Sequence, residues 1–592
     1  MEMALGSGVR RCRWAALAAL ASALAVAAPT AAFDSERDAQ NRAKSGERER
    51  EHATDEYQAE LRARSAQNAA DGAAILAGDP ERVAGGTGET VCFSYGSGCA
   101  GDVRLYDFQE RGRGLVTPVL WTARNGSTVS GHVWATRAGP AKRPGIVITN
   151  GSIQAPETLY WWAAQTLAKS GYVVVTFDPQ QQGRSDTYGD GIDRNEGVPS
   201  QTEGNTFFDW TQDGIDFLLS TPEQPFCARP SRSGTSHCDK QERRVREGRN
   251  AAFNPFWELV DGERIGIAGH SYGAAGVSWV GQQDERVDAV VAWDNLCAPT
   301  AVGRTGEGPT GAACLRGGQG DPPGFRVPSL GITNDSFSGN ESRSSDPDPL
   351  ERSRGSLAFS EAGVDTGSIA IRGGTHFEFS YLPSRAFRAT LRGIDLAAWY
   401  TTAWFDKYVK GDRSADARLL TTRWRSDPGD LAVDPRGGGN LYSFYYRSRL
   451  DIRRADGTRF TCEDLREGCP GQVARDGRPP HYSYLAIATS LDGTDPAQVG
   501  PGRPRLALRI RYRGRSCARR RVMHVRVVGR DAAAVHRLVL RHRGRVRARG
   551  GRSVRVRLRR LRRSGRMVVT ATLRDGRRVT FRRYLTLCTR RR

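Results

Sequence analysis

The chain has 592 residues, too many for one compact core, and its 38% of hydrophobic residues is enough to form several cores. The formal net charge is +23, but residues 501–592 contain 33 arginines against the two acids Asp531 and Asp575. The rest of the chain is therefore mildly acidic, with a net charge of about −8. The protein is therefore not basic throughout, because its positive charge is concentrated at the C-terminal end.

The first 32 residues have the pattern of a secretory signal peptide. Arginines within residues 10–13 precede an alanine-rich apolar run, 14–28, which is too short to span a bilayer comfortably. Small residues follow, so we expect cleavage after Ala27 or Ala32. No other stretch is long and apolar enough for a membrane span. The sequence therefore predicts a secreted protein with no transmembrane segment after signal removal.

The cysteines agree with export. Of the eleven, Cys12 leaves with the signal, and the other ten fall into neighbouring pairs along the chain. In an oxidising compartment they predict five disulfides. The pairs are Cys92–Cys99, Cys227–Cys238, Cys297–Cys314, Cys462–Cys469 and Cys517–Cys588. The competing interpretation is a zinc site, but it lacks a C-x-x-C pair and a nearby histidine cluster, so no metal is expected.

The segment after the signal, residues 33–90, is a charged N-terminal arm with few large apolar residues, in which helix is expected from Ala53 to Gln67. A loosely attached arm or pro-segment and a packed element fit this composition equally well. Strand-like runs then predict an antiparallel meander that opens the next domain, at residues 102–108, 115–123 and 128–136.

From Pro144 onward, short apolar runs alternate with amphipathic helical runs, and a long helix is expected within residues 385–411. The predicted strands are "GIVIT", "YVVVTF", "RIGIAGH", "RVDAVVAW", "VPSLGITND" and "GSIAIRGG". Such alternation is typical of a mostly parallel, doubly wound α/β sheet covered on both faces. We therefore expect an α/β domain over residues 91–430.

Two insertions interrupt the alternation, one from Thr221 to about Trp257 and one from Cys297 to Gly324. Both leave the sheet near the carboxyl ends of strands, where open α/β sheets bind ligands. They are candidate pocket walls or a lid, and surface decoration fits equally well.

Two further segments follow the predicted sheet. Residues 431–500 are assigned to a linking segment, and residues 501–592 to a small, arginine-rich all-β module resembling a sandwich, with a hairpin turn at Asp575-Gly576. The arginines fit attraction to an anionic cell-surface polymer, and equally a solvated surface in an arginine-biased sequence. Nucleic acid is the least favoured partner, because aromatic residues are sparse and export argues against a genomic partner.

The motif that carries chemistry is Gly269-His270-Ser271-Tyr272-Gly273, which fits G-x-S-x-G between a predicted strand and a predicted helix. In that context the serine occupies a sharp, strained turn and its oxygen projects above the sheet. The alternative is a structural serine in a tight turn. The context favours Ser271 as a nucleophile.

A serine nucleophile needs a base, and the base needs an acid to orient it. The side chain of His270 should point away from the neighbouring Ser271, whereas His376 follows the last predicted strand and a glycine pair. The expected acid is Asp335, directly after the penultimate strand, although it could instead close an Asx turn. Asp294, at the end of the preceding strand, is the main alternative acid.

Acyl transfer also requires an oxyanion hole of backbone N–H groups. One donor should be the N–H of Tyr272, directly after the nucleophile. The second is expected in the loop Asn150-Gly151-Ser152-Ile153, where Ser152 is our choice and Ile153 the next.

In combination these segments resemble the α/β-hydrolase fold superfamily over about half of the chain, from Leu115 to Gly411. The matching pieces are "GIVITNGS", "SGYVVVTFDPQQQGRSD", "GHSYG", "VPSLGITND" and "GTHFEF". One departure is Asn-Gly in the oxyanion loop, where many relatives have His-Gly. The resemblance implies acyl hydrolysis through an acyl-enzyme, without a metal or an organic cofactor, and it does not define the substrate.

The sequence thus predicts a secreted, esterase- or lipase-like serine hydrolase that cleaves carboxylic esters, with a small-molecule or polymeric ester as substrate. A serine peptidase with the same three catalytic residues is the enzymatic alternative. The alternative from another class is a catalytically silent binding protein on the same fold.

Overall fold

The structure is a computed structural model of the whole chain. It describes residues 35–86, 100–106, 108, 114–152, 156–299, 313–343, 346–382, 387–391, 393–424, 441–475, 506–513, 522–529, 532–533, 535–558, 561, 564–573 and 578–585. Several predicted features lie outside these residues: the signal peptide, Ile153, the Cys92–Cys99 and Cys517–Cys588 pairs, and the turn at Asp575-Gly576.

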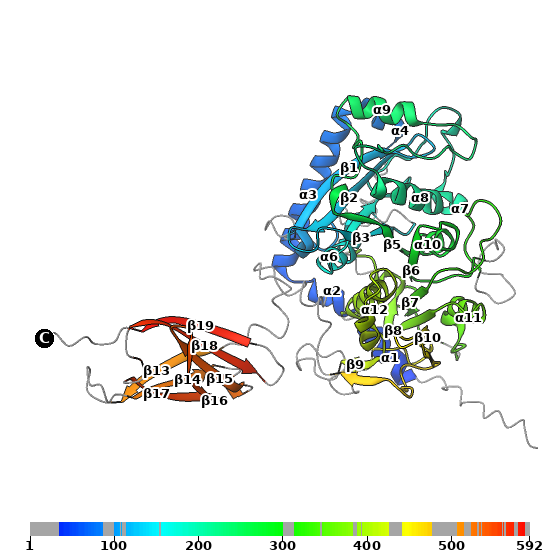
Figure 1. Cartoon of the computed structure of the whole chain (residues 1–592). Coiled ribbons are helices and arrows are strands. Elements are labelled where there is room, and N and C mark those ends of the chain that lie inside the picture. Colours follow the sequence, from blue (N-terminus) through cyan, green and yellow to red (C-terminus); the bar gives the residue numbers. More distant parts are fainter. Residues whose placement is uncertain are drawn as a thin grey trace, which may run out of the picture.

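A mixed ten-stranded sheet forms the centre of an α/β domain (Figure 1). Its strand order is β1-β2-β4-β3-β5-β6-β7-β8-β10-β11. The six strands from β4 to β8 in this order are parallel, and antiparallel pairs extend both edges. The strands are β1 Gly114–Thr122, β2 Thr128–Thr136, β3 Arg143–Thr149, β4 Val173–Phe177, β5 Val260–His270, β6 Val287–Trp293, β7 Ser329–Ser336, β8 Thr366–Thr375, β10 Arg449–Arg453 and β11 Arg459–Cys462.

Helices cover both faces of this sheet, which is why its central strands are apolar along their whole length. One face packs against α6 (Trp161–Lys169) and α12 (Gly393–Tyr408), and the other against α8 (Asn205–Leu219), α10 (Tyr272–Gln283) and α11 (Arg354–Glu361). Successive residues of a strand point to opposite faces. In β6, for example, Trp293 packs in the core on the α6 and α12 face, and Ala292 packs in the core on the opposite face.

Two segments beside the sheet have a different structure from the one that the sequence predicts. Residues 102–108 were expected to form a strand, which is wrong, because the 3-10 helix η2 spans Val103–Tyr106. The Asp102 carboxylate accepts hydrogen bonds from both the backbone N–H and the guanidinium of Arg104, and such local bonds favour a turn over a strand. Strands β10 and β11 come from the stretch assigned to a linking segment, yet they extend the main sheet beyond β8.

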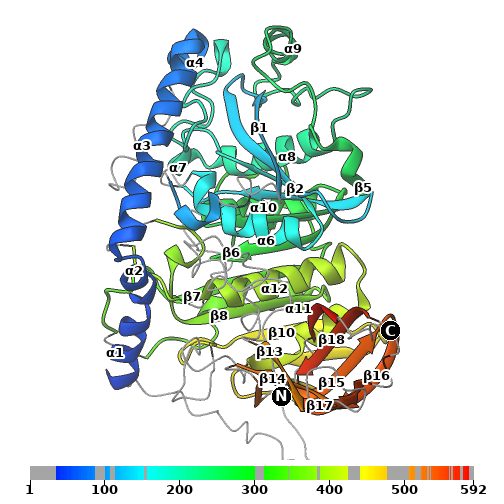
Figure 2. The ribbon, with the colours of Figure 1, turned by 90° about the vertical axis from the view of Figure 1, so that its left-hand side faces the viewer.

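The N-terminal arm is a packed part of the structure. Its helices α1 (Ser35–Lys44), α2 (Glu47–Glu51), α3 (Asp55–Gly78) and α4 (Pro80–Gly85) form a column along one side of the α/β domain (Figure 2). The helix expected at Ala53–Gln67 is thus confirmed, and it continues further. Because the arm offers few apolar side chains, polar groups do much of the anchoring. Two of its arginines, Arg48 and Arg82, are among the most deeply buried large side chains.

The C-terminal segment forms small antiparallel sheets, as expected for an all-β module. One sheet has the order β13-β14-β17 and the other β16-β15-β18-β19, and inward side chains of both share one apolar core. The strands are β13 Ala507–Arg513, β14 Val522–Val528, β15 Val535–His542, β16 Arg545–Gly550, β17 Ser553–Arg557, β18 Gly565–Leu573 and β19 Arg578–Leu585. A separate two-stranded parallel sheet pairs β9 (Thr421–Trp424) with β12 (Val473–Arg475).

Three of the five predicted disulfides lie within the described residues, and all three are formed. They are Cys227–Cys238, Cys297–Cys314 and Cys462–Cys469. None of the described helices is both long enough and apolar enough to cross a membrane.

Candidate active site

Ser271 alone forms the turn between β5 and α10. Its backbone has φ 56° and ψ −119°, a conformation that a residue with a side chain rarely adopts. The two motif glycines permit this turn, because neighbouring backbone leaves no room for a Cβ atom at either position. A Cβ on Gly273 would lie 2.4 Å from the carbonyl oxygen of Thr149, and one on Gly269 would lie 2.3 Å from that of Gly273. The sequence therefore builds a strained serine at the carboxyl end of a central strand.

The side chain of Ser271 is the first of three that are joined in a row. His376 Nε2 lies 3.0 Å from Ser271 Oγ, and His376 Nδ1 lies 2.5 Å from Asp294 Oδ2. The other carboxylate oxygen of Asp294 accepts a hydrogen bond of 2.8 Å from the Thr333 hydroxyl. We call Ser271, His376 and Asp294 the three-residue row.

The carboxylate of Asp294 is electrostatically suited to face an imidazole. Burial raises its pKa, but the hydrogen bond and charge of His376, the charge of Arg352 and a bond from Asn334 outweigh burial and hold the pKa well below its usual range. The carboxylate is therefore ionised at neutral pH. An ionised acid at this place orients the ring and stabilises the imidazolium form of His376.

Asp335, the expected acid, lies elsewhere, and this corrects the sequence-based choice. Its Oδ2 accepts hydrogen bonds from Asn41 Nδ2 at 3.1 Å and from the Gly373 N–H at 2.7 Å, while the Ser443 hydroxyl donates to Oδ1. The end of β7 is thus covered by the N-terminal arm and by the segment that leads into β10. Asp294 reaches His376 instead, because its backbone turns with a positive φ of 46° as the chain leaves β6.

His270 points away from the Ser271 side chain, as expected, and links two other parts of the site. Its Nε2 donates to the carbonyl oxygen of His376 at 2.9 Å, so its Nδ1 accepts from the hydroxyl of Tyr160 at 2.7 Å. That hydroxyl in turn accepts from the Gly151 N–H at 3.1 Å. Burial and the nearby His376 lower the pKa of His270 to about 3, so the ring is neutral. We call Gly151, Tyr160, His270 and His376 the His270 chain.

The two predicted oxyanion donors lie on segments that meet at Ser271. Tyr272 is the first residue of α10, where a helix leaves backbone N–H groups without intrahelical acceptors. A Cβ on Gly151 would lie 3.0 Å from Ser271 Cβ, so the loop after β3 packs against Ser271. Because the Gly151 N–H is bonded to Tyr160, the next N–H along the loop is that of Ser152. Its role as a donor stays a prediction.

An exposed aromatic residue beside the row escaped the sequence analysis. The Phe337 side chain is 59% exposed and stacks on the His376 ring, with ring centroids 5.0 Å apart and an interplanar angle of 15°. Its only signal in the sequence is its position two residues after the end of a predicted strand. By contrast, Trp161 and Trp162 of α6 are buried in the core of the sheet domain.

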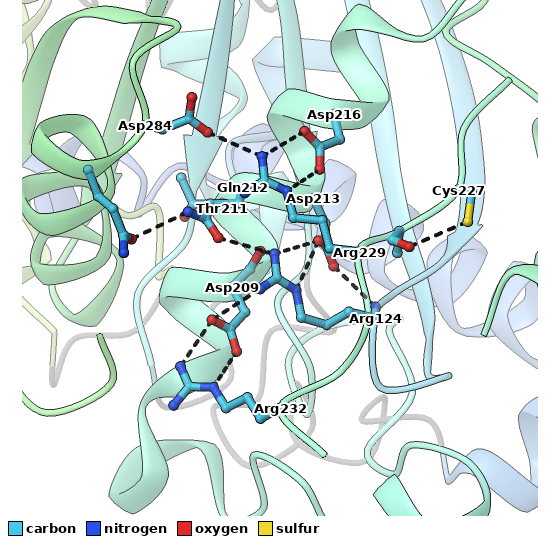
Figure 3. Close-up of polar contacts among 12 residues, drawn as sticks. Arg124, Asp209, Thr211, Gln212, Asp213, Asp216, Cys227, Arg229, Arg232 and Asp284 are labelled. Carbon is cyan, nitrogen blue, oxygen red and sulfur yellow. Dashed lines mark hydrogen bonds and ion pairs between the residues drawn. The ribbon is translucent and has the colours of Figure 1, made fainter. Parts of the chain in front are cut away.

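The two insertions border a cavity of about 590 Å³ near Tyr272. Arg232 of the first insertion and Arg316 of the second both line it, and the Tyr272 hydroxyl donates to the carbonyl oxygen of Arg316 at 2.7 Å. Ion pairs connect the first insertion to α8 (Figure 3). Arg229 lies 2.9 Å from Asp216, and Arg232 lies 2.6 Å from Asp209. The insertions are therefore cavity walls.

Within the part of the chain that the structure describes, no group of three or more His, Cys, Asp or Glu side chains is arranged to hold a metal ion. Comparison of the sequence with protein-family models and with curated proteins found no match. The functional assignment therefore depends on the geometry of the site.

Proposed function

We propose that the protein is a secreted serine hydrolase of the α/β-hydrolase type that cleaves carboxylic esters through an acyl-enzyme. The observation that carries this proposal is the three-residue row, in which a serine on a strained turn lies 3.0 Å from an imidazole nitrogen. The opposite nitrogen of that ring lies 2.5 Å from a buried carboxylate. A nucleophile, a base and an orienting acid in this order are the requirements for acyl transfer to a hydroxyl.

In the proposed mechanism, Ser271 Oγ attacks the ester carbonyl carbon while His376 Nε2 accepts the hydroxyl proton. Asp294 stabilises the imidazolium that forms. The N–H groups of Tyr272 and Ser152 donate to the oxyanion of the tetrahedral intermediate. Collapse of this intermediate breaks the bond to the alcohol oxygen, which takes the proton from His376. Water then attacks the acyl-enzyme by the same route and releases the acid.

Secretion is part of the proposal. Three disulfides within the described residues are consistent with an oxidising compartment. The signal-like N-terminus of the sequence points the same way.

The decisive experiment is covalent labelling with a fluorophosphonate, combined with hydrolysis of a soluble chromogenic ester. We expect the wild-type protein to be labelled and to hydrolyse the ester, and Ser271→Ala to do neither. Ser278→Ala is a matched control, because Ser278 lies in α10, the helix that follows Ser271, and its hydroxyl donates to the Ala274 carbonyl. An unlabelled wild-type protein would contradict the proposal and favour a silent binding protein. Faster cleavage of chromogenic peptides than of esters would favour a peptidase.

We also propose that the C-terminal module attracts an anionic cell-surface polymer. In β17, Arg555 and Arg557 are exposed while the alternating Val554 and Val556 are buried, so arginines gather on the outer side of the strand. The 33 arginines of this segment are opposed by two acids. A surface of one charge sign attracts polymers of the opposite sign, and salt weakens that attraction.

A further inference from the structure

A deeply buried arginine near the three-residue row belongs to the N-terminal arm. Arg48, in α2, is only 2% exposed. Its guanidinium donates to three backbone carbonyl oxygens within the four residues directly after His376. The accepting carbonyl oxygens are those of Phe377 at 2.7 Å, Glu378 at 3.1 Å and Ser380 at 3.2 Å.

This arginine stays charged in spite of its burial. Burial alone would lower its pKa, but the nearby Tyr381 ring, Glu49 and Glu378 raise the pKa above its ordinary value. The guanidinium carbon also lies 4.5 Å from the centre of the Tyr381 ring. A buried charge is tolerated only when its hydrogen bonds are satisfied, so the three carbonyl groups must keep one arrangement around it.

The same part of the arm also binds the other segments that surround His376. The Ser45 hydroxyl donates to the Gly339 carbonyl at 3.1 Å, and His376 itself donates its N–H to the Phe337 carbonyl at 3.0 Å. On the far side, the Arg48 N–H donates to the Ala389 carbonyl at 3.2 Å. Residues 45–48 therefore bridge the chain before and after the histidine.

The histidine loop has little regular structure of its own. It follows the end of β8, where Gly373 has a φ of +66°, and it begins with the short 3-10 helix η7 (His376–Glu378). A loop of this kind needs external contacts to hold a ring within hydrogen-bond reach of a nucleophile. The arm supplies these contacts from a segment that precedes Ser271 by more than two hundred residues.

We propose that Arg48 is a positioning residue for His376, and that the arm is a permanent clamp on the histidine loop of the working enzyme. This inference rests on the proposed hydrolase function. Arg48 touches no reacting atom, and it acts by fixing the backbone that carries the imidazole. Without the guanidinium, the ring should sample orientations in which it does not bridge Ser271 and Asp294.

The test compares Arg48→Ala and Arg48→Lys with Arg82→Ala. Arg82 is a matched control, because it is a second fully buried arginine of the arm, bonded to Asp186 at 3.2 Å and to the carbonyl of Arg184. For Arg48→Ala we expect kcat on a soluble ester to fall about 10- to 100-fold with little change in KM. Arg48→Lys should be intermediate, because an ammonium cannot reach all three carbonyls in one plane.

Two further readouts separate positioning from general loss of stability. Guanidinium ion, added below concentrations that unfold the protein, should restore part of the kcat of Arg48→Ala and none of that of Arg82→Ala. In proton NMR, the His376 Nδ1–H bonded to Asp294 should give a far-downfield signal in the wild type and in Arg82→Ala. That signal should be broadened or lost in Arg48→Ala.

The outcomes distinguish this inference from the proposed function. If the wild-type protein is not labelled by fluorophosphonate, the proposed hydrolase function is contradicted. The downfield NMR signal still tests whether Arg48 positions His376. If labelling and activity are present, a folded Arg48→Ala with unchanged kcat and signal overturns the inference. Equal losses of kcat in Arg48→Ala and Arg82→Ala overturn it too. Should Arg48→Ala not fold, wild-type kcat and signal in Arg48→Lys would be the overturning result.

Discussion

The ends of two neighbouring strands, β6 and β7, each carry an aspartate, and the surroundings of the two carboxylates differ sharply. Asp294 after β6 faces the imidazole of His376, and its pKa is held well below the usual range. Asp335 in β7 accepts hydrogen bonds from neutral groups, and burial raises its pKa in spite of those bonds and of the charge of Arg343. An acid at the carboxyl end of a strand therefore has no role by position alone, because the group that it faces decides the role.

The largest difference in kcat is expected between the Asp→Asn variants at these two positions. Asp294→Asn should lower kcat about 10⁴-fold, because an amide favours the wrong tautomer of His376 and cannot stabilise an imidazolium. KM should change little, since the side chain does not touch substrate. Steady-state kinetics on a soluble ester measure both values, and thermal unfolding confirms that the variant is folded. A kcat within tenfold of wild type would remove Asp294 from the mechanism.

A moderate effect is expected from Tyr160→Phe, which tests whether the His270 chain supports the three-residue row. The change removes only the hydroxyl that accepts from Gly151 and donates to His270. Losing hydrogen bonds of this kind costs about 1–2 kcal/mol, so we expect kcat to fall about tenfold. The rate of fluorophosphonate labelling should fall in parallel. Unchanged rates in a folded variant would show that the chain has no influence on catalysis.

Asp335→Asn should change kcat less than about threefold, because the amide can keep bonds to Ser443 and Gly373 while removing a buried charge. The folded-state pKa of Asp335 is raised above its ordinary value of 3.8, so the protonated carboxyl stabilises the folded protein. This stabilisation is fully present below pH 3.8 and is lost as the pH rises through the folded-state pKa. At pH 7 the variant should therefore be at least as stable as wild type, and its advantage should shrink towards pH 4.

Denaturant unfolding at several pH values checks this expectation. Asp335→Ala is the control, because it leaves three buried donors without an acceptor and should cost about 1–3 kcal/mol for each. A large loss of kcat in Asp335→Asn, equal to that in Asp294→Asn, would erase the difference between the two strand ends.

The smallest effect on the site is expected from deletion of residues 501–592, whose strands form an apolar core of their own. Hydrolysis of a small soluble ester should be nearly unchanged. Retention on an anionic matrix should weaken, and the difference from wild type should be largest at low salt. A large loss of soluble-ester activity would instead make the module part of the catalytic fold.

Local patterns in the sequence determined much of this protein. The alternation of strands and helices, the glycine-flanked turn at Ser271 and the place of His376 after β8 depend on residues close together in the chain, whose periodicity and size can be read directly. The same holds for the three disulfides, which close loops between sequence neighbours.

Only the tertiary structure decided which acid meets the histidine, and what holds the histidine in place. Asp294 and His376 are 82 residues apart, Asn41 and Asp335 are 294 apart, and Arg48 and Phe377 are 329 apart. Such pairs form when separate segments cover the same strand ends, and no local pattern records which segments will meet. Buried polar groups must find partners wherever the fold brings them, so their roles are determined by the packing of the whole domain.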